Sequence, residues 1–451
     1  MKRHRIGSLL TLLTALATGT AAVPQAAFAA PSPQGPVVAA FDRAAHPLRT
    51  VEPGGPGGDL RALDRMAGDA RVLGLGEATH GSHDFFALKD RVFRHLVEEK
   101  GFRTFALEAP WTTGRRLDDY VVHGTGDPRR IFAEEFQRDY RWWDNTDYLR
   151  LVEWMRARNI RHPDDPVRFL GDDVAWAGPE AYDAVTTYVA RTHPEASAHL
   201  AALYRGLRPT VPTGRYIEQY LRTPYAQRAR MAGRTGRALE LLRRLGPGRD
   251  RAAYDEALRN ATAVDQVARQ YSYDFEDPAQ LAASMRYRDA TMAANVLDWQ
   301  RRTGSRILLS AHDAHVAYEP QDPVHYPKAQ GAFLRDRLGP DYVSVGLTFD
   351  RGSFNATGPD GSVRRWTLGP AGPDSNEATL DRVRHRDYLL DLRTLRSPAR
   401  GWLTTARPTH CIGTDYPGVP CAVALARSHD VLIHLHRVEA ARWRDREQGT
   451  G

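Results

Sequence analysis

Cysteine is almost absent from this chain of 451 residues, which contains only Cys411 and Cys421. Two cysteines cannot build a disulfide-rich scaffold, and their spacing does not suggest a metal site. Neither is placed as a catalytic nucleophile. In an exported protein the pair is suited to a disulfide that closes a short loop around "IGTDYPGVP", and we predict that bond. Two free, buried thiols are the alternative.

Lysine is also scarce, with four residues among the 62 lysines and arginines. They are Lys2, Lys89, Lys100 and Lys328, so arginine carries nearly all of the positive charge. The formal net charge is +7, but the arginines are spread among 55 acidic residues and do not form a basic tail. No recognised nucleic-acid-binding module accompanies them, and we expect no nucleic-acid partner.

Long apolar runs are missing after the N-terminus, so no later segment is long enough to span a bilayer. The N-terminus itself has the three parts of a secretory signal peptide. The charged "MKRHR" precedes the apolar "IGSLLTLLTALATGTAAV", and "AFA" at 27–29 is a small-x-small cleavage site. We predict that residues 1–29 are removed and that the mature protein is secreted, without stable membrane insertion. An uncleaved anchor is the alternative.

Apolar segments that alternate with helical patterns predict an α/β fold. Strands are expected at 71–77, 102–109, 167–173, 306–316 and 342–350, and a helix is expected at 82–99. This alternation is typical of a mainly parallel or mixed sheet flanked by helices. The block 178–303 has an almost entirely helical pattern and is too long for one crossover, so it predicts a large helical subdomain.

The domain boundaries follow from changes in composition. Residues 30–58 are rich in proline, glycine and alanine and predict a flexible leader. The catalytic domain is expected over 59–440, and the strand-like "HDVLIHLHRV" lies near its end. Residues 441–451 are expected to form a tail.

Charged and imidazole side chains follow four of the five predicted strands. They are Glu77 and His80, Glu108, Asp172 and Asp173, and His312, Asp313 and His315. In an open parallel sheet, ligands bind beyond the carboxyl ends of the strands, so these groups are expected to converge. The helix start after Gly81 would add backbone donors near the same point.

The residue types at this edge favour general acid–base activation of water. The chain has no G-x-S-x-G elbow, Walker loop or dinucleotide-binding fingerprint. His80 is the candidate base, and Glu77 or Glu108 is its candidate orienting carboxylate. His312 or His315 would stabilise an oxyanion or protonate a leaving alkoxide.

A metal site at the same residues is the alternative chemistry. Glu77, His80, His312 and His315 are suitable ligands for zinc or another divalent metal. However, E-x-x-H and H-x-x-H on strand-to-loop segments are less specific than H-E-x-x-H on a helix. We therefore predict no cofactor and keep the divalent metal as an open alternative.

Four segments resemble the erythromycin esterase family and follow the family's order. They are "LGEATHGSHDFFALKDRVFRHLVEEKGFRTFALEA" (75–109), "MRYRDATMAANVLDW" (285–299), "SAHDAHVAY" (310–318) and "GAFLRDRLGPDYVSVGLTFDRGSF" (331–354). The resemblance spans roughly residues 60–440. It implies an α/β core with a substantial helical part. It also implies hydrolysis of a macrolactone ester by activated water, without a covalent enzyme intermediate.

The resemblance assigns roles to the residues that match its motifs. His80 takes the general-base position, Glu77 and Glu108 the acidic positions, and His312 and His315 the histidine pair. It also supplies candidates for substrate binding, namely Lys89, Arg288 and Asp289.

Two of these assignments carry qualifications. Lys89 stands where macrolide-hydrolysing members carry arginine, so the charge is kept but the bidentate fork is lost. For Arg288 and Asp289, a structural ion pair between helix and core is the alternative. His83 is expected to be a first-turn helix residue and not a catalytic one.

The predicted function is an exported carboxylic ester hydrolase that acts on a small-molecule ester or lactone. A resistance esterase that protects a ribosome would work in the cytosol, so export points to another ester or to compounds outside the cell. The main alternative is a non-enzymatic haem- or metal-binding protein that uses the same cleft, because the fold also resembles a haem-binding lipoprotein family. Hydrolysis of a phosphoester or peptide bond is a third possibility.

Overall fold

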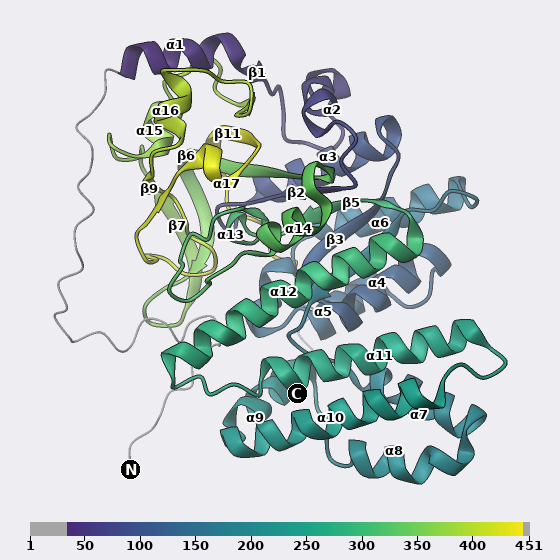
Figure 1. The fold of residues 1–451 in the computed structure, drawn as a ribbon. Coiled ribbons are helices and arrows are strands. Elements are labelled where there is room, and N and C mark those ends of the chain that lie inside the picture. The colour runs from purple at the N-terminus through teal and green to yellow at the C-terminus, as the bar shows by residue number, and fades with distance from the viewer. Residues whose placement is uncertain (1–33, 445–451) are drawn as a thin grey trace.

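A mixed β-sheet with helices on both faces forms the centre of the molecule (Figure 1). The computed structural model describes residues 34–444. Within that range one sheet has nine strands, in the order β1-β8-β11-β6-β2-β5-β3-β4, with β7 paired to β6. A separate two-stranded sheet pairs β9 with β10. The predicted α/β class and mainly parallel sheet are confirmed.

Six strands of the large sheet run parallel, and the others pair antiparallel. The parallel strands are β2 (Val72–Leu75), β3 (Phe102–Pro110), β4 (Arg168–Asp173), β5 (Arg306–Ser310), β6 (Tyr342–Thr357) and β11 (Val431–Val438). The antiparallel strands are β1 (His46–Pro47), β7 (Val363–Leu368) and β8 (Tyr388–Asp391), and the small sheet contains β9 (Arg407–Thr409) and β10 (Cys421–Val423).

The helices fall into those that cover the sheet and those that form a layer of their own. The covering helices are α1 (Gln34–Ala44), α2 (Arg61–Ala67), α3 (His83–Glu99), α4 (Trp111–His123), α5 (Pro128–Glu135), α6 (Thr146–Arg161), α12 (Pro278–Thr303), α13 (Asp313–Val316), α14 (Gln330–Leu338), α15 (Asn376–Leu380), α16 (Ala399–Leu403) and α17 (Leu425–Ser428). The separate layer contains α7 (Pro179–Thr192), α8 (Ser197–Tyr204), α9 (Thr213–Arg222), α10 (Tyr225–Leu245) and α11 (Arg251–Gln270).

Alternate residues of the parallel strands build two different cores. Leu73 and Leu75 of β2 join the core beneath α3 and α6, while Val72 joins the core beneath α12 and α14. Leu308 and Leu309 of β5 divide between the same two cores. Successive side chains of a strand point to opposite faces, so strands that are covered on both faces are apolar throughout. This explains why the strand segments are continuous apolar runs in the sequence.

Three predicted strands end at least two residues away from the expected position. The strand predicted at 71–77 ends at Leu75, so Glu77 lies in the loop after β2. The segment 306–316 is a strand only as far as Ser310, and α13 follows it. His312 caps α13, because its Nδ1 accepts the backbone N–H of Ala314 at 3.2 Å. The strand expected at 342–350 instead continues to Thr357, because its second half pairs with β7.

The predicted helical subdomain is confirmed as a layer with its own core. Helices α7 to α11 bury a separate apolar cluster, and Figure 1 shows this layer beneath α12. The long helix α12 returns the chain to the sheet, where it contacts β4 and α14. The helical layer therefore lies beside the strands that carry the candidate site residues.

The prediction of a flexible leader over 30–58 is wrong for residues 34–44. Residues 34–44 form α1, whose Val37 and Phe41 are buried against α15, α16 and β8. The glycine- and proline-rich composition concealed an apolar stripe in "QGPVVAAFDRA".

The start of the predicted tail, residues 441–444, also contacts the rest of the protein, because Arg444 Nε donates to Asp144 Oδ1 at 2.5 Å.

Two further predictions concern the cysteines and the membrane. Cys411 and Cys421 form a disulfide, as expected. The predicted signal peptide, residues 1–29, lies outside the described residues. Among residues 34–444, none of the helices combines the length and apolar character that crossing a bilayer requires.

Candidate active site

Four neighbouring strands bring the predicted site residues to one edge of the sheet. Strands β2, β5, β3 and β4 are adjacent and parallel, so their carboxyl ends meet. Glu77 follows β2, Glu108 lies near the end of β3, Asp173 ends β4, and His312 follows β5. The contacts described below confirm that these groups converge.

Two glycines of the segment 75–81 allow other parts of the chain to approach it closely. A Cβ atom on Gly76 would lie 1.8 Å from Asp313 Oδ1, and one on Gly81 would lie 1.9 Å from the backbone oxygen of Asn355. Neither position therefore has room for a side chain. The backbone N–H of Asp313 also donates to the Glu77 carbonyl at 2.9 Å. Elements α13 and β6 thus fix the loop that carries Glu77 and His80.

The central contact of the site is a line of three buried side chains. Glu77 Oε1 lies 2.6 Å from His80 Nδ1, and Glu77 Oε2 accepts a hydrogen bond from Lys89 Nζ at 2.6 Å. Because Glu77 accepts from Nδ1, neutral His80 carries its proton there and has a lone pair on Nε2. No group among residues 34–444 is hydrogen-bonded to that Nε2. This is the geometry of an oriented general base, and Glu77, not Glu108, is the carboxylate in contact.

The backbone and ring of His80 are held independently of Glu77. Its N–H donates to the Gly413 carbonyl at 3.0 Å, and its ring lies edge-on to Trp143 with centroids 4.9 Å apart. Gly413 belongs to the loop that the Cys411–Cys421 disulfide closes. The disulfide loop is therefore part of the support of the candidate base.

His312 faces His80 and is electrically neutral. The two ring centroids are 5.2 Å apart. Burial is the main cause that lowers the pKa of His312 to about 3. Because its Nδ1 accepts the Ala314 N–H, the neutral ring carries its proton on Nε2. That Nε2 is buried and has no hydrogen-bond partner among the described residues, so it is an available donor beside the base.

A second network lies behind His312 and centres on Arg288. The guanidinium makes a two-pronged contact with Asp173, at 2.9 and 2.6 Å, and also donates to Glu108 Oε1 at 2.9 Å. The other oxygen of Glu108 accepts the backbone N–H of His312 at 3.1 Å. Since these groups are buried, the network fixes the start of the His312 loop relative to β3 and β4.

His315 belongs to this network, where it lies between two carboxylates. Its Nδ1 lies 2.6 Å from Asp289 Oδ1, and its Nε2 lies 3.3 Å from Glu108 Oε1. Burial opposes protonation, but the charges of Glu108 and Asp289 prevail and raise the pKa of His315 to about 10. Burial likewise opposes charge on Glu108, but His315 and the other cations hold its pKa well below the usual range. Both ring nitrogens of His315 are engaged by Asp289, Glu108 and Arg288, so only His312 is free to donate.

Three predicted roles change once the contacts are known. Lys89 is fully buried and pairs with Glu77, so its ammonium supports Glu77 and is not placed to contact a substrate directly. Arg288 and Asp289 form the ion-pair arrangement that was the alternative to substrate binding. The first helical N–H of α3, from His83, donates to the Glu439 carbonyl, so it is not an open donor at the site.

His83 itself lies apart from the candidate base, as expected. It is the first residue of α3, and its ring lies between Asp147, at 3.0 Å, and Glu52, at 2.9 Å. The hydrogen bond to Asp147 is the main cause that raises the pKa of His83 to about 9.

Sequence reasoning identified some buried acids at the strand ends without giving them roles. Burial raises the pKa of Asp313 to about 8 and raises the pKa of Asp172 well above its usual range. Asp172 accepts a hydrogen bond from Gln330 Nε2 at 2.6 Å, and Tyr140 hydrogen-bonds to Asp173. The available signal was the position of Asp172 at the carboxyl end of β4 and of Asp313 in the segment that follows β5. Nothing in the sequence pointed to Gln330 or Tyr140.

The predicted metal ligands do not gather around one point. Among residues 34–444, three ligand atoms come within 4.8 Å of one another in one group, which is formed by other residues. The donor atoms of Glu77, His80, His312 and His315 do not form such a group.

Two hollows differ in their relation to the site. A groove of about 540 Å³ lies between α11 and α12 and is lined by none of the candidate catalytic residues. A small cavity of about 40 Å³ borders Asp173, Arg288 and Tyr326. The small cavity beside Asp173 and Arg288 has room for water or a small group.

Comparisons with known proteins agree with this architecture. A family model described as erythromycin esterase matches residues 97–438. A curated relative, erythromycin esterase type II of Escherichia coli, is 24% identical over 322 residues, which cover 67% of this chain and 74% of that protein.

Solved structures also share the fold. A protein described as a succinoglycan biosynthesis protein is 26% identical, with a TM-score of 0.81 over 92% of this chain and 100% of that one. A mutant of erythromycin esterase EreC in its open conformation is 16% identical, with a TM-score of 0.67 over 86% of this chain and 96% of that one. At this identity, the likeness to EreC concerns the fold alone.

Proposed function

The chain belongs to the erythromycin esterase family, and we propose that it is an exported hydrolase that cleaves a macrolactone or other carboxylic ester with water activated by His80. Family membership supports an esterase-type hydrolase acting on a small molecule. The observation that carries the mechanism is the buried contact of Glu77 with His80 Nδ1, which leaves Nε2 directed away from its carboxylate.

The proposed reaction uses two rings with different tasks. His80 Nε2 removes a proton from water while the water oxygen attacks the acyl carbon of the ester. The carbonyl electrons move to oxygen, and the resulting oxyanion accepts a hydrogen bond from His312 Nε2. When the intermediate collapses, the bond to the alkoxy oxygen breaks, and His80 returns its proton to that oxygen. The products are a carboxylic acid and an alcohol, and no covalent bond to the protein forms.

The surrounding charges support these tasks. Lys89 neutralises the far oxygen of Glu77, and the near oxygen holds the Nδ1–H of His80 and stabilises the imidazolium that forms. Glu108 holds the His312 backbone. The scheme needs no cofactor, because the acid, the base and the oxyanion donor are all side chains of this chain.

A screen for hydrolysis tests the proposed reaction. The protein is incubated with macrolides and with simpler lactones and linear esters, and products are analysed by mass spectrometry. We expect at least one ester to gain the mass of one water, with ring opening in the case of a lactone. If no ester is hydrolysed and added haem shows a shifted Soret band with the protein, the proposal is wrong and a binding function takes its place.

Export is tested separately, because it depends on residues 1–29 and not on the site. The charged segment, the apolar segment and the "AFA" sequence support cleavage after Ala29. The full-length gene is expressed in a host with a functional secretion pathway, and the intact mass of the recovered protein is measured. We expect a chain outside the cytoplasm that begins at Ala30. Intact chain retained in the cytoplasm would contradict export and would leave the esterase proposal unaffected.

A further inference from the structure

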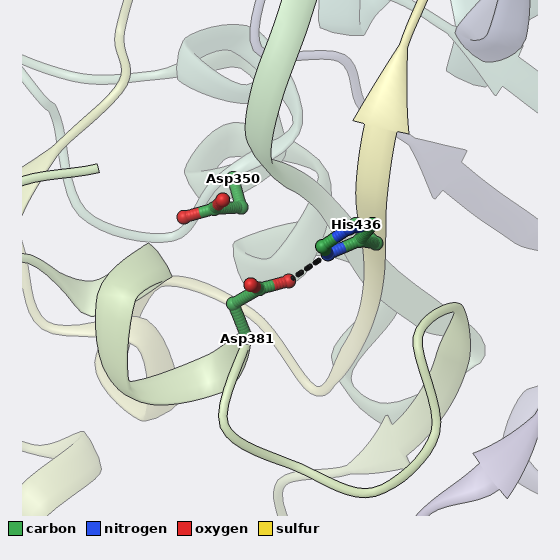
Figure 2. Close-up of side chains that lie close together, drawn as sticks. All are labelled: Asp350, Asp381 and His436. Carbon is green, nitrogen blue, oxygen red and sulfur yellow. Dashed lines mark hydrogen bonds and ion pairs between the residues drawn. The ribbon is translucent and has the colours of Figure 1, made fainter. Parts of the chain in front are cut away.

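A second cluster of polar side chains lies on strands β6 and β11, outside the residues proposed for catalysis (Figure 2). It contains Asp350 of β6, His436 of β11 and Asp381, which directly follows α15. One ligand atom from each lies within 4.8 Å of the others. None of the three has a place in the hydrolysis described above.

The strand register explains why the cluster forms. Phe349 pairs with Leu435 and Arg351 with Arg437, so Asp350 and His436 occupy the same position on adjacent parallel strands. Residues paired in this way point to the same face of a sheet. Two residues earlier, Thr348 pairs with His434, which places a second imidazole on that face. Asp381 covers the face from the end of α15, as Figure 2 shows.

His434 provides an observation that is independent of the carboxylates. Its side chain is 0% exposed, and its Nδ1 lies 3.0 Å from the Thr348 hydroxyl. Its Nε2 is buried without a hydrogen-bond partner, although it lies 3.5 Å from Asp381 Oδ1. The same Oδ1 contacts His436 Nδ1 at 2.6 Å. Two imidazole nitrogens are therefore directed at one carboxylate oxygen, and one of them lacks a partner.

We propose that Asp350, Asp381 and His436 bind a divalent transition-metal cation with the ligand preference of Zn²⁺. The unpartnered Nε2 of His434 lies beside this site, next to Asp381 Oδ1. Carboxylate oxygens and imidazole nitrogens are zinc ligands, with bonds of about 2.0–2.2 Å in a tetrahedral arrangement. Two such ligands are separated by about 3.3 Å. Asp381 Oδ1 and His436 Nδ1 are 2.6 Å apart in the metal-free site, so they would move apart as the ion takes the place of their hydrogen bond.

In the structure, the guanidinium of Arg351 pairs with two of the proposed ligands and would compete with a metal ion for them. Its guanidinium contacts Asp350 Oδ2 at 2.5 Å and Asp381 Oδ2 at 3.2 Å. The Arg351 side chain is 31% exposed, so it can turn into solvent when a metal binds. The backbone N–H of Ala371 holds the other Asp350 oxygen at 3.1 Å. Metal binding would release the proton that His436 and Asp381 share.

Binding of zinc to the metal-free protein tests this site. The full chain is treated with a chelator, the chelator is removed, and Zn²⁺ is added in a calorimeter. We expect the wild-type protein to bind one zinc ion per chain. In Asp381→Asn and in His436→Gln, this ion should be lost or bound at least about tenfold more weakly. Removing the competitor with Arg351→Gln should tighten binding. Asp391→Asn is the matched control, because Asp391 pairs with Arg393 and should keep wild-type affinity.

Two further measurements keep the result interpretable. Asp350→Asn replaces Asp381→Asn if the latter does not fold, as judged by circular dichroism of the metal-free proteins. Anomalous scattering at the zinc edge from loaded crystals should place the ion between β6, β11 and the end of α15. The proposal is overturned if the protein binds no zinc, or if the bound zinc persists in the Asp381 and His436 variants. Loss of that zinc in His80→Ala alone would also overturn it, because the ion would then lie at the candidate active site.

Discussion

Replacing His80 with alanine is expected to lower kcat for ester hydrolysis by about 10²–10⁴-fold, the usual contribution of a general base. His80 is the residue whose Nδ1 is held by Glu77 and whose Nε2 is left for water. Without the imidazole, the attacking water must lose its proton to solvent, and the leaving alkoxide receives none from the protein. The measurement is steady-state turnover of an ester identified in the screen, at fixed pH.

The matched control is His83→Ala, three residues further along the chain. His83 contacts Asp147 and Glu52 and does not contact Glu77 or His312, so its loss should leave kcat within a few-fold of the wild-type value. Circular dichroism spectra and melting temperatures should show that both variants are folded. Full activity in His80→Ala would refute the assignment. Equal losses in both variants would indicate a structural effect and not the loss of a base.

The location of the site could be predicted from the sequence because it follows from strand polarity. Carboxyl ends of parallel strands meet at one edge, so polar residues after four apolar runs had to converge if the strands were neighbours. The structure shows that the four strands are neighbours, in the order β2-β5-β3-β4, which the sequence could not show. Helix α3 was equally predictable, because Phe85, Leu88, Val92 and Leu96 recur at helical spacing and are all buried.

The charge states within the site could not be predicted, because they depend on three-dimensional neighbours. His312 and His315 are two residues apart in "HDAH", yet one has a pKa lowered to about 3 and the other a pKa raised to about 10. The difference arises from Asp289 and Glu108, which flank His315 and come from distant parts of the chain. The choice of Glu77 over Glu108 as the partner of His80 also required the structure.

Two other features were missed for different reasons. The apolar stripe of α1 was hidden by the proline- and glycine-rich composition around it, because a composition average ignores periodicity. The cluster of Asp350, Asp381 and His436 combines residues far apart in the sequence. It depends on the register of β6 and β11, which no local motif records.

Replacing Lys89 with methionine is expected to lower the free energy of unfolding by about 3–5 kcal/mol, the cost of removing one partner from a buried ion pair. The side chains of Lys89 and Glu77 are both 0% exposed, and Nζ lies 2.6 Å from Oε2. Methionine fills a similar volume but leaves the Glu77 carboxylate buried beside apolar atoms. Glu77 then gains a proton or exposes itself to water, and either change weakens its hold on His80. Activity should therefore fall together with stability.

A double mutant and an exposed ion pair separate the charge effect from packing. Adding Glu77→Gln to Lys89→Met removes the stranded charge, so the double mutant should be more stable than Lys89→Met alone but no more active. Arg71 and Asp341 form an exposed pair, with side chains 57% and 38% accessible, and Arg71→Met should cost less than about 1 kcal/mol. Chemical denaturation of the four proteins measures these differences. If Lys89→Met costs no more than Arg71→Met, the buried pair is not what stabilises Glu77, and the support proposed for His80 must come from elsewhere in the loop.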